Sequence, residues 1–194
     1  IATTAIRGRF LDIQNTVAQA RDIHDQVRYV EDGLVIIQEG KIQWFGPWQE
    51  GQSRLPTNAE LQHYPDQLIV PGFIDTHIHF PQTEMIGAYG EQLLEWLNTY
   101  TFPTEIQFQD ASYSEKIAEF FVQELLKNGT TTALVFCTVH PESVDALFNA
   151  ATTRNMRLIA GKVLMDRHAP EALTDTAETA YIDSKTLIEK WHGQ

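Results

Sequence analysis

The stretch Pro71–His79 reads PGFIDTHIH, and it decides both the fold and the place of the chemistry. It has the apolar character of a β-strand, and its end carries two histidines, His77 and His79, one position apart. Because side chains alternate across a strand with a period of two, both imidazoles point to the same side. The stretch therefore predicts a strand that can offer two nitrogen ligands to one metal ion.

Two further strands are predicted downstream. Residues 130–137 form a nearly continuous β-branched and apolar run, as expected of a strand buried on both faces, and residues 157–165 form the next strand. Helical patterns separate the three strands. Alternating strands and helices of this kind indicate an α/β fold with a parallel sheet, either open or closed into a barrel.

The helices are predicted from apolar residues at helical spacing. The first covers residues 90–100 and stops before Pro103, the second opens with a capping box at residues 112–115, the third begins at Pro141, and the last covers residues 174–191. The residues expected to face inward are Leu93, Leu97 and Tyr100, then Ile117, Phe120, Phe121 and Leu125, then Val144, Leu147, Phe148 and Ala151, and finally Ala177, Tyr181, Ile188 and Trp191.

The residues before this stretch indicate a small β domain. Residues 5–13 alternate as a half-buried strand does, and residues 33–37 and 41–45 flank a tight turn at Gly40 as a hairpin. Polar loops with glycine and proline follow. We therefore expect two domains, a small β domain over residues 1–67 and an α/β domain over residues 68–194.

Composition excludes several classes of function. The chain has 14 Lys and Arg against 26 Asp and Glu, a net charge of −12, so attraction to nucleic acid or to an anionic membrane is not expected. Its single cysteine, Cys137, allows no internal disulfide, and no apolar run approaches the length of a membrane span, about 20 residues. We expect no leader, because no charged-then-apolar pattern is found in the first residues. We expect a cytoplasmic protein.

His77 and His79 lie at the carboxyl end of their strand, where α/β proteins keep their active sites. Spacing alone leaves two interpretations open, a metal site or two histidines hydrogen-bonded to the backbone. Asp75 is expected on the same side, either near a ligand imidazole or capping backbone amides. Gln82, in the following loop, is either a solvated residue or a group that reads the edge of an amide-like ring.

Other polar residues follow the later strands. His140 and residues 166–168, Asp-Arg-His, are expected at the same mouth as the histidine pair, where each is more typical of a satisfied loop residue than of a catalyst. Cys137 is expected in the core. The aromatic group of Trp96, Tyr100 and Phe102 is expected to be packing.

At this point the residues resemble a known family. The stretch Pro71–His79 resembles the opening metal motif of the amidohydrolase superfamily, and Leu94–Glu105, Lys127–Ala133 and Gly161–Asp166 are similar to the branch of that superfamily that deaminates guanine. The resemblance implies the N-terminal portion of a (β/α)8 TIM-like barrel, preceded by one half of a small β-sandwich. The present chain would supply the first three βα units.

The resemblance also implies the chemistry. One Zn²⁺ per active site would activate water, and guanine would be hydrolysed to xanthine and ammonia. His77 and His79 would be metal ligands, and the substrate-binding segment would be His79, Phe80, Pro81 and Gln82. A homodimer is expected. Two alternatives stay open, an amidohydrolase acting on another aminated heterocycle, such as a purine, pterin or triazine, and a non-catalytic fragment or interaction module.

The parts that complete such a site come later in the family's sequences. They are an Arg-Phe pair that binds the purine, a His-x-x-Glu with the third ligand and the proton-shuttle glutamate, a further histidine and a late aspartate ligand. All are expected beyond Gln194, so we expect no catalytic residue in this chain. Alone, the 194 residues are expected to bind zinc poorly, to be inactive and to present an open strand edge.

Overall fold

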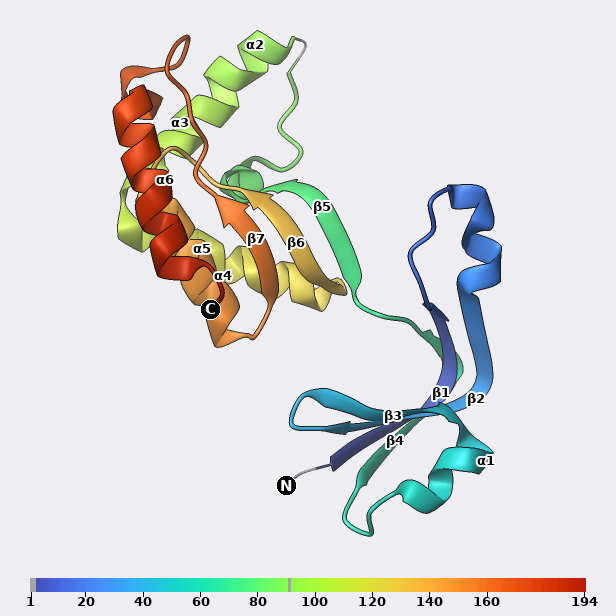
Figure 1. Cartoon of the computed structure of the whole chain (residues 1–194). Coiled ribbons are helices and arrows are strands. Elements are labelled where there is room, and N and C mark those ends of the chain that lie inside the picture. Colours follow the sequence, from blue (N-terminus) through green and yellow to red (C-terminus); the bar gives the residue numbers. More distant parts are fainter. Residues whose placement is uncertain (1–2, 91) are drawn as a thin grey trace. The chain divides into compact units, whose positions relative to one another are not determined.

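A computed structural model of the chain describes residues 3–90 and 92–194 (Figure 1). It consists of two compact units, Ile1–Pro71 and Gly72–Gln194. The sequence places the domain boundary after residue 67, whereas the first unit extends to the end of its last strand and the Val70-Pro71 link. No helix in the described ranges is long and apolar enough to cross a membrane.

The first unit is a four-stranded sheet with the strand order β3-β2-β1-β4. β1 pairs antiparallel with β2 and parallel with β4, and β2 pairs antiparallel with β3. The predicted hairpin is confirmed: its turn uses Glu39 at φ 51° and Gly40 at φ 72°, the left-handed conformations that a two-residue hairpin turn requires. The strands are β1 (Thr3–Ile13), β2 (Val27–Gln38), β3 (Lys41–Pro47) and β4 (Glu60–Ile69).

A small core holds this sheet together. Ala5, Leu34 and Ile36 are buried and pack against the side chains of Trp44, Trp48 and Leu55. Apart from the strands, the unit contains the short helices η1 (Ala20–Gln26), α1 (Trp48–Gly51) and η2 (Gln52–Arg54). Because this core contains few buried side chains, it can stabilise only a small sheet.

β4 is a strand that the sequence did not indicate. Pro65 lies within it and cannot donate a ladder hydrogen bond, which argues against a strand. The ladder with β1 shifts at this point, because Gly8 pairs with Tyr64 and Arg9 pairs with Leu68. The irregularity leaves Pro65 out of the pairing and lets the strand continue on either side.

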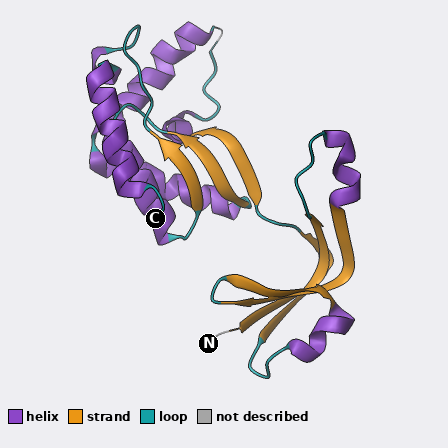
Figure 2. Cartoon of the chain, in the orientation of Figure 1, coloured by secondary structure: helices purple, strands orange, loops and turns teal. Residues whose placement is uncertain are grey.

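The second unit contains a parallel three-stranded sheet with the order β5-β6-β7 (Figure 2). Its strands are β5 (Phe73–His79), β6 (Thr130–Phe136) and β7 (Arg157–Gly161). The three predicted strands are thus confirmed. β7 ends at Gly161 rather than at Met165, because its partner β6 ends at Phe136, which pairs with Gly161.

Three helices, α4 (Ala111–Lys127), α5 (Pro141–Thr153) and α6 (Ala177–Trp191), pack with the sheet around one core. α4 contacts β6, α5 contacts β7, and the helices contact each other in sequence (Figure 1). The other face of the sheet is open: Ile74 is 68% exposed and Ile159 is 58% exposed. The prediction that residues 130–137 are buried on both faces is therefore wrong, because helices cover one face of β6 and leave Leu134 exposed.

The start and the buried face of α4 differ from the prediction. Asp110 caps the helix by accepting hydrogen bonds from the backbone amides of Ser112 and Tyr113, so Ser112 is already inside the first turn and the predicted capping box does not form. Phe121 is buried as predicted, but Phe120 is 54% exposed. The helix ends with Asn128 as the cap and Gly129 at φ 87°, a left-handed conformation that glycine adopts readily.

The buried face of α6 is rotated relative to the prediction. Ala180 and Leu187 are buried, whereas Tyr181 is 68% and Ile188 is 62% exposed. The Trp191 ring stacks on Phe148 of α5 at 5.2 Å between centroids, and its Nε1 donates to Asp145 at 2.7 Å. These contacts fix the rotation of the helix, and a pattern of apolar residues on one helix could not specify them.

The predicted helix over residues 90–100 is continuous with the residues beyond it. α2 (Leu93–Trp96) leads into a π-helical turn, η4 (Leu97–Thr101), and then into α3 (Phe102–Ile106) and η5 (Gln107–Gln109). The prediction that it stops before Pro103 is wrong. Proline normally clashes with the preceding helical turn, but here the backbone N–H of Phe102 bonds to Leu97 across the wider π turn, and Pro103 occupies the first turn of α3.

Candidate metal and substrate site

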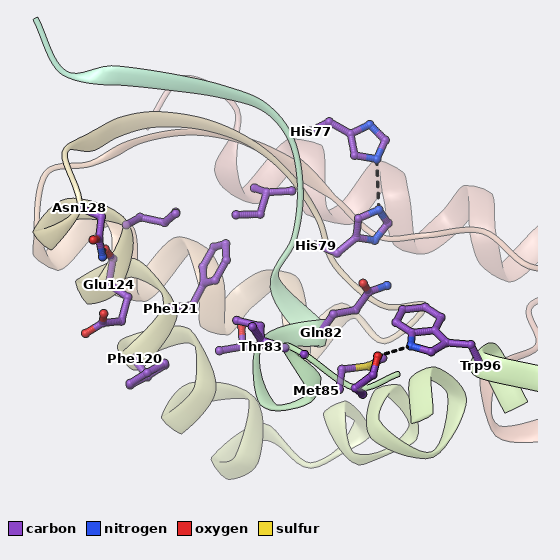
Figure 3. Close-up of a pocket in the computed structure, with 15 residues that line it drawn as sticks. His77, His79, Gln82, Thr83, Met85, Trp96, Phe120, Phe121, Glu124 and Asn128 are labelled. Atoms are coloured by element: carbon purple, nitrogen blue, oxygen red, sulfur yellow. Dashed lines mark hydrogen bonds between the residues drawn. The ribbon is translucent and has the colours of Figure 1, made fainter. Parts of the chain in front are cut away.

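The end of β5 brings the two histidines together. His77 and His79 flank Ile78, which packs against the core, so both imidazoles lie on the face turned away from the helices. Their Nε2 atoms are 3.3 Å apart and point at each other (Figure 3). The predicted common orientation of the pair is what the structure shows.

Phe136, at the end of β6, supports both rings. β5 and β6 run in register here, with His79 opposite Phe136. The His79 ring stacks on it at 4.8 Å with an interplanar angle of 15°, and the His77 ring lies 4.7 Å away at 39°. One aromatic side chain on the neighbouring strand thereby restricts the rotation of both imidazoles.

The separation of the two Nε2 atoms is compatible with a shared ion. A tetrahedral ion bound to two imidazole nitrogens at about 2.0–2.1 Å holds them about 3.3 Å apart, and a long hydrogen bond between the rings has a similar length. The observed separation is 3.3 Å. Burial, followed by the charge of His77, lowers the pKa of His79 and favours the neutral imidazole that binds metals. The pair therefore fits two ligands of one ion.

Asp75 does not join the imidazoles. A register shift between Asp75 and Ile78 interrupts the alternation of β5, and Asp75 pairs with the buried residue Ala133 of β6. Its Oδ1 accepts the backbone N–H of His77 at 3.0 Å. Of the two readings left open by the sequence, the structure shows the carboxylate that caps a backbone amide.

The residues after β5 form the short helix η3 (Phe80–Met85), which turns Gln82 toward an open pocket of about 650 Å³. The pocket is also lined by His77, His79 and Trp96 (Figure 3). Phe80 and Pro81 are fully buried, and Phe80 packs on Phe108 and Phe121 at 5.0 and 5.7 Å between centroids. Of the predicted substrate-binding segment, His79 and Gln82 present side chains to the pocket.

α3 carries a buried carboxyl group. Glu105 of α3 is 8% exposed. Burial raises its pKa to about 7, opposed by hydrogen bonding from the Gln82 side chain. The helix that carries this carboxyl group packs against η3, which carries Gln82.

Comparison with known proteins places these residues in a family. The sequence matches the family model described as "Amidohydrolase family" over residues 68–193. The chain belongs to the amidohydrolase family.

Individual relatives extend the match over the other residues of this amidohydrolase. It is 57% identical to the guanine deaminase of Escherichia coli, covering 97% of the chain and 43% of that protein. The E. coli guanine deaminase structure superposes with a TM-score of 0.92. The guanine deaminase from Bradyrhizobium japonicum is 40% identical, with a TM-score of 0.90, over 100% of this chain and 42% of that one.

A third structure has a ligand. It is the guanine deaminase from C. acetobutylicum, described with bound guanine in its active site. It is 27% identical, with a TM-score of 0.81, over 99% of this chain and 43% of that one. The chain thus spans less than half the length of the relatives it matches.

Other candidate residues do not reach the pocket of this amidohydrolase. His140 precedes α5, and its ring nitrogens contact Thr138 Oγ1 at 3.1 Å and the carbonyl of Ala172 at 3.0 Å, as expected of a satisfied loop residue. Arg167 forms a two-pronged ion pair with its neighbour Asp166. Cys137 is 1% exposed, and burial raises its pKa, so it is the core residue that was predicted.

Sequence reasoning missed two supporting residues and misjudged a third. Phe136 and Glu105 were not singled out, and Trp96, expected to be packing, lines the pocket and donates Nε1 to the Ala88 carbonyl at 3.0 Å. The sequence could have indicated Phe136, because this residue ends β6 beside the end of β5. Among the residues that the structure describes, no three His, Cys, Asp or Glu side chains cluster as a metal site.

Proposed function

We propose that the intact protein containing this chain hydrolyses guanine to xanthine and ammonia with the help of one zinc ion. The observation that carries the proposal is the histidine pair, in a chain 57% identical to the E. coli guanine deaminase over 97% of its length. The structure from C. acetobutylicum, with guanine in its active site, supports the choice of substrate. Since the chain covers 43% of the E. coli protein, the proposal concerns the whole protein.

We assign His77 and His79 as two zinc ligands. Neutral imidazole nitrogens are preferred zinc donors, and the 3.3 Å between the Nε2 atoms suits a tetrahedral ion. When bound, zinc supplies a Lewis acid that makes water nucleophilic near neutral pH. The Phe136 ring keeps both imidazoles in the orientation that the ion requires.

The proposed hydrolysis accounts for each bond and proton. A bond forms between the oxygen of water and the purine carbon that bears the exocyclic amine, the bond from that carbon to nitrogen breaks, and the departing amine takes a proton to leave as ammonia. Gln82 contacts the purine, and His79 lines the same pocket. The buried side chains of Phe80 and Pro81 anchor this segment in the core. The proton-shuttle glutamate and the remaining ligands are proposed beyond Gln194.

The architecture proposed for the intact protein follows from the open face of the sheet. We propose that β5, β6 and β7 are the first three strands of a (β/α)8 barrel, and that the sheet of residues 1–67 is half of a composite β-sandwich. In this arrangement further strands cover Ile74 and Ile159, which are exposed here. We also propose a cytoplasmic homodimer, and an isolated 194-residue chain without deaminase activity.

The function is tested with the intact protein and guanine. We expect conversion to xanthine with release of ammonia, loss of activity on removal of zinc by a chelator, and recovery when zinc is restored. His79→Ala should lower activity more than about 100-fold, beyond the effect of losing a residue that supports a metal ligand. Unchanged turnover after complete zinc removal contradicts the proposal. Preference for another aminated heterocycle over guanine would reassign the substrate.

A further inference from the structure

Residues 86–90, which we call the turn segment, lie between η3 and α2. Three of them, Ile86, Gly87 and Ala88, line the pocket that contains the histidine pair. The side chains of the turn segment anchor it little, because Ile86 is 84% exposed and Tyr89 is 79% exposed. The position of this wall of the pocket therefore depends on the contacts of its backbone.

The first half of the turn segment has a defined backbone conformation. The backbone N–H of Ala88 donates to the carbonyl of Met85 at 3.0 Å. Between these residues, Ile86 has φ −55° and ψ 125°, and Gly87 has φ 82°. These are the angles of a type II turn, whose third residue needs the positive φ that glycine adopts without steric cost. Because Met85 is 8% exposed, the turn is attached to the core at its first residue.

Trp96 of α2 contacts the second half of the turn segment. Its indole Nε1 donates to the Ala88 carbonyl at 3.0 Å (Figure 3). An indole nitrogen only donates and a carbonyl oxygen only accepts, so the direction of this hydrogen bond is fixed. Trp96 also lies against Gly90, where a Cβ atom would be 2.6 Å from the Trp96 Cβ and 2.7 Å from its Cδ1. The close approach therefore requires glycine at this position.

We propose that Trp96 is a positioning residue, whose indole N–H holds the turn segment in place as a wall of the pocket before a heterocycle binds. A wall that is already in place does not have to be ordered on binding, so the affinity for the ligand is higher. The choice of guanine as that ligand rests on the proposed function. The hydrogen bond of Trp96 affects binding in this scheme and leaves the histidines of β5 undisturbed.

The first test changes Trp96 in the intact protein, with guanine as the substrate. Trp96→Phe keeps an aromatic ring and removes the indole N–H. We expect KM for guanine to rise about fivefold, the scale of one neutral hydrogen bond, with kcat altered less than about twofold and the zinc content unchanged. An unchanged KM, or a loss confined to kcat, overturns the proposal.

Gly90 allows the same contact to be broken without altering Trp96. Gly90 lies outside the set of residues that line the histidine pocket, and it lacks the positive φ that would strain an alanine. Gly90→Ala should raise KM by a factor similar to that of Trp96→Phe. The double variant should exceed the single variants by less than about twofold, because both changes break one contact. Effects that multiply overturn the proposal.

Trp191 of α6 provides a matched control. Its Nε1 donates to Asp145 at 2.7 Å, and its side chain lies outside the histidine pocket. Trp191→Phe also removes an indole hydrogen bond, so it should lower stability and leave KM for guanine unchanged. A rise in KM equal to that of Trp96→Phe would mean that lost stability explains both effects, and it would overturn the proposal.

A second measurement separates this inference from the proposed function. The ¹⁵N-labelled indole of Trp96, assigned with Trp96→Phe, should exchange its proton slowly in the wild type and more than about tenfold faster in Gly90→Ala. A protected indole proton without turnover of guanine would remove the proposed function and keep the positioning role. Fast exchange in a wild type that turns over guanine, or equal exchange in both proteins, would remove the positioning role.

Discussion

Two ionisable side chains are buried near the edge strands of the parallel sheet. One has an oppositely charged partner and the other has none in the part of the chain that the structure describes. After β7, the fully buried Lys162 side chain donates to Asp175 at 2.8 Å and lies 3.7 Å from Asp183. On α3, Glu105 is buried, and the described elements packed against α3 carry no basic side chain. The paired lysine ties together the segment between β7 and α6. The uncompensated glutamate lies on α3, which packs against η3, the helix that carries Gln82.

The difference lies in what each buried group contributes to stability. A buried ion pair stabilises one arrangement of its segment only while both partners are present. A lone buried carboxyl group lowers stability at neutral pH.

The largest effect is expected at the paired site. Lys162→Met leaves Asp175 buried without its cation, and we expect the free energy of unfolding to fall by about 3 kcal/mol. Urea denaturation of the intact protein measures it. Lys185→Met is the matched control, since Lys185 is exposed and 3.8 Å from Glu189, and it should cost less than about 1 kcal/mol. Equal losses of unfolding free energy in the two variants would show that the buried ion pair contributes no more than the exposed one.

The next effect is pH-dependent and concerns the unpaired site. The pKa of Glu105 is about 7 in the folded protein against an ordinary value of 4.5, so the folded state binds more protons between these values, and this group lowers stability as pH rises through that window. Glu105→Leu should therefore gain stability relative to the wild type between pH 4.5 and 7, up to about 3 kcal/mol.

The measurement is urea denaturation of both proteins at several pH values. Glu95→Gln serves as the control, because Glu95 is an exposed carboxyl group on the preceding helix α2. Its stability difference from the wild type should not change across this window. A difference for Glu105→Leu that is the same at pH 5 and pH 8 would show that Glu105 is no more costly than a surface glutamate.

The smallest effect is expected at the orphaned hydroxyl group. Thr101→Val replaces a buried Oγ1 without a partner in the described residues by a methyl group of similar size. We expect a gain of about 1 kcal/mol in the free energy of unfolding, since an unsatisfied buried hydroxyl is costly. A loss of stability would show that Thr101 makes a hydrogen bond in the intact protein.

The parts of the fold that local patterns determine were predictable. The alternation around Ile78 indicated that His77 and His79 share a side, and the β-branched run indicated β6. Prediction failed where distant contacts decide. Trp191 against Phe148 sets the rotation of α6, and the pairing of β4 with β1 accommodates Pro65.

The candidate site divides in the same way. His77, His79 and Gln82 lie close in sequence, and a motif could identify them. Glu105 lies on α3, which continues the helix after a π-helical turn before Pro103, where the sequence instead indicated a stop. Helical glutamates are usually exposed, so the burial of this one depends on tertiary packing that no spacing specifies.

The most direct test of the account is anomalous diffraction at the zinc absorption edge from crystals of the intact protein. We predict one peak at about 2.0–2.1 Å from the Nε2 atoms of both His77 and His79. The peak should be absent in crystals of His79→Ala. A zinc ion bound elsewhere, with the two rings 3.3 Å apart and bonded only to each other, would contradict the central claim.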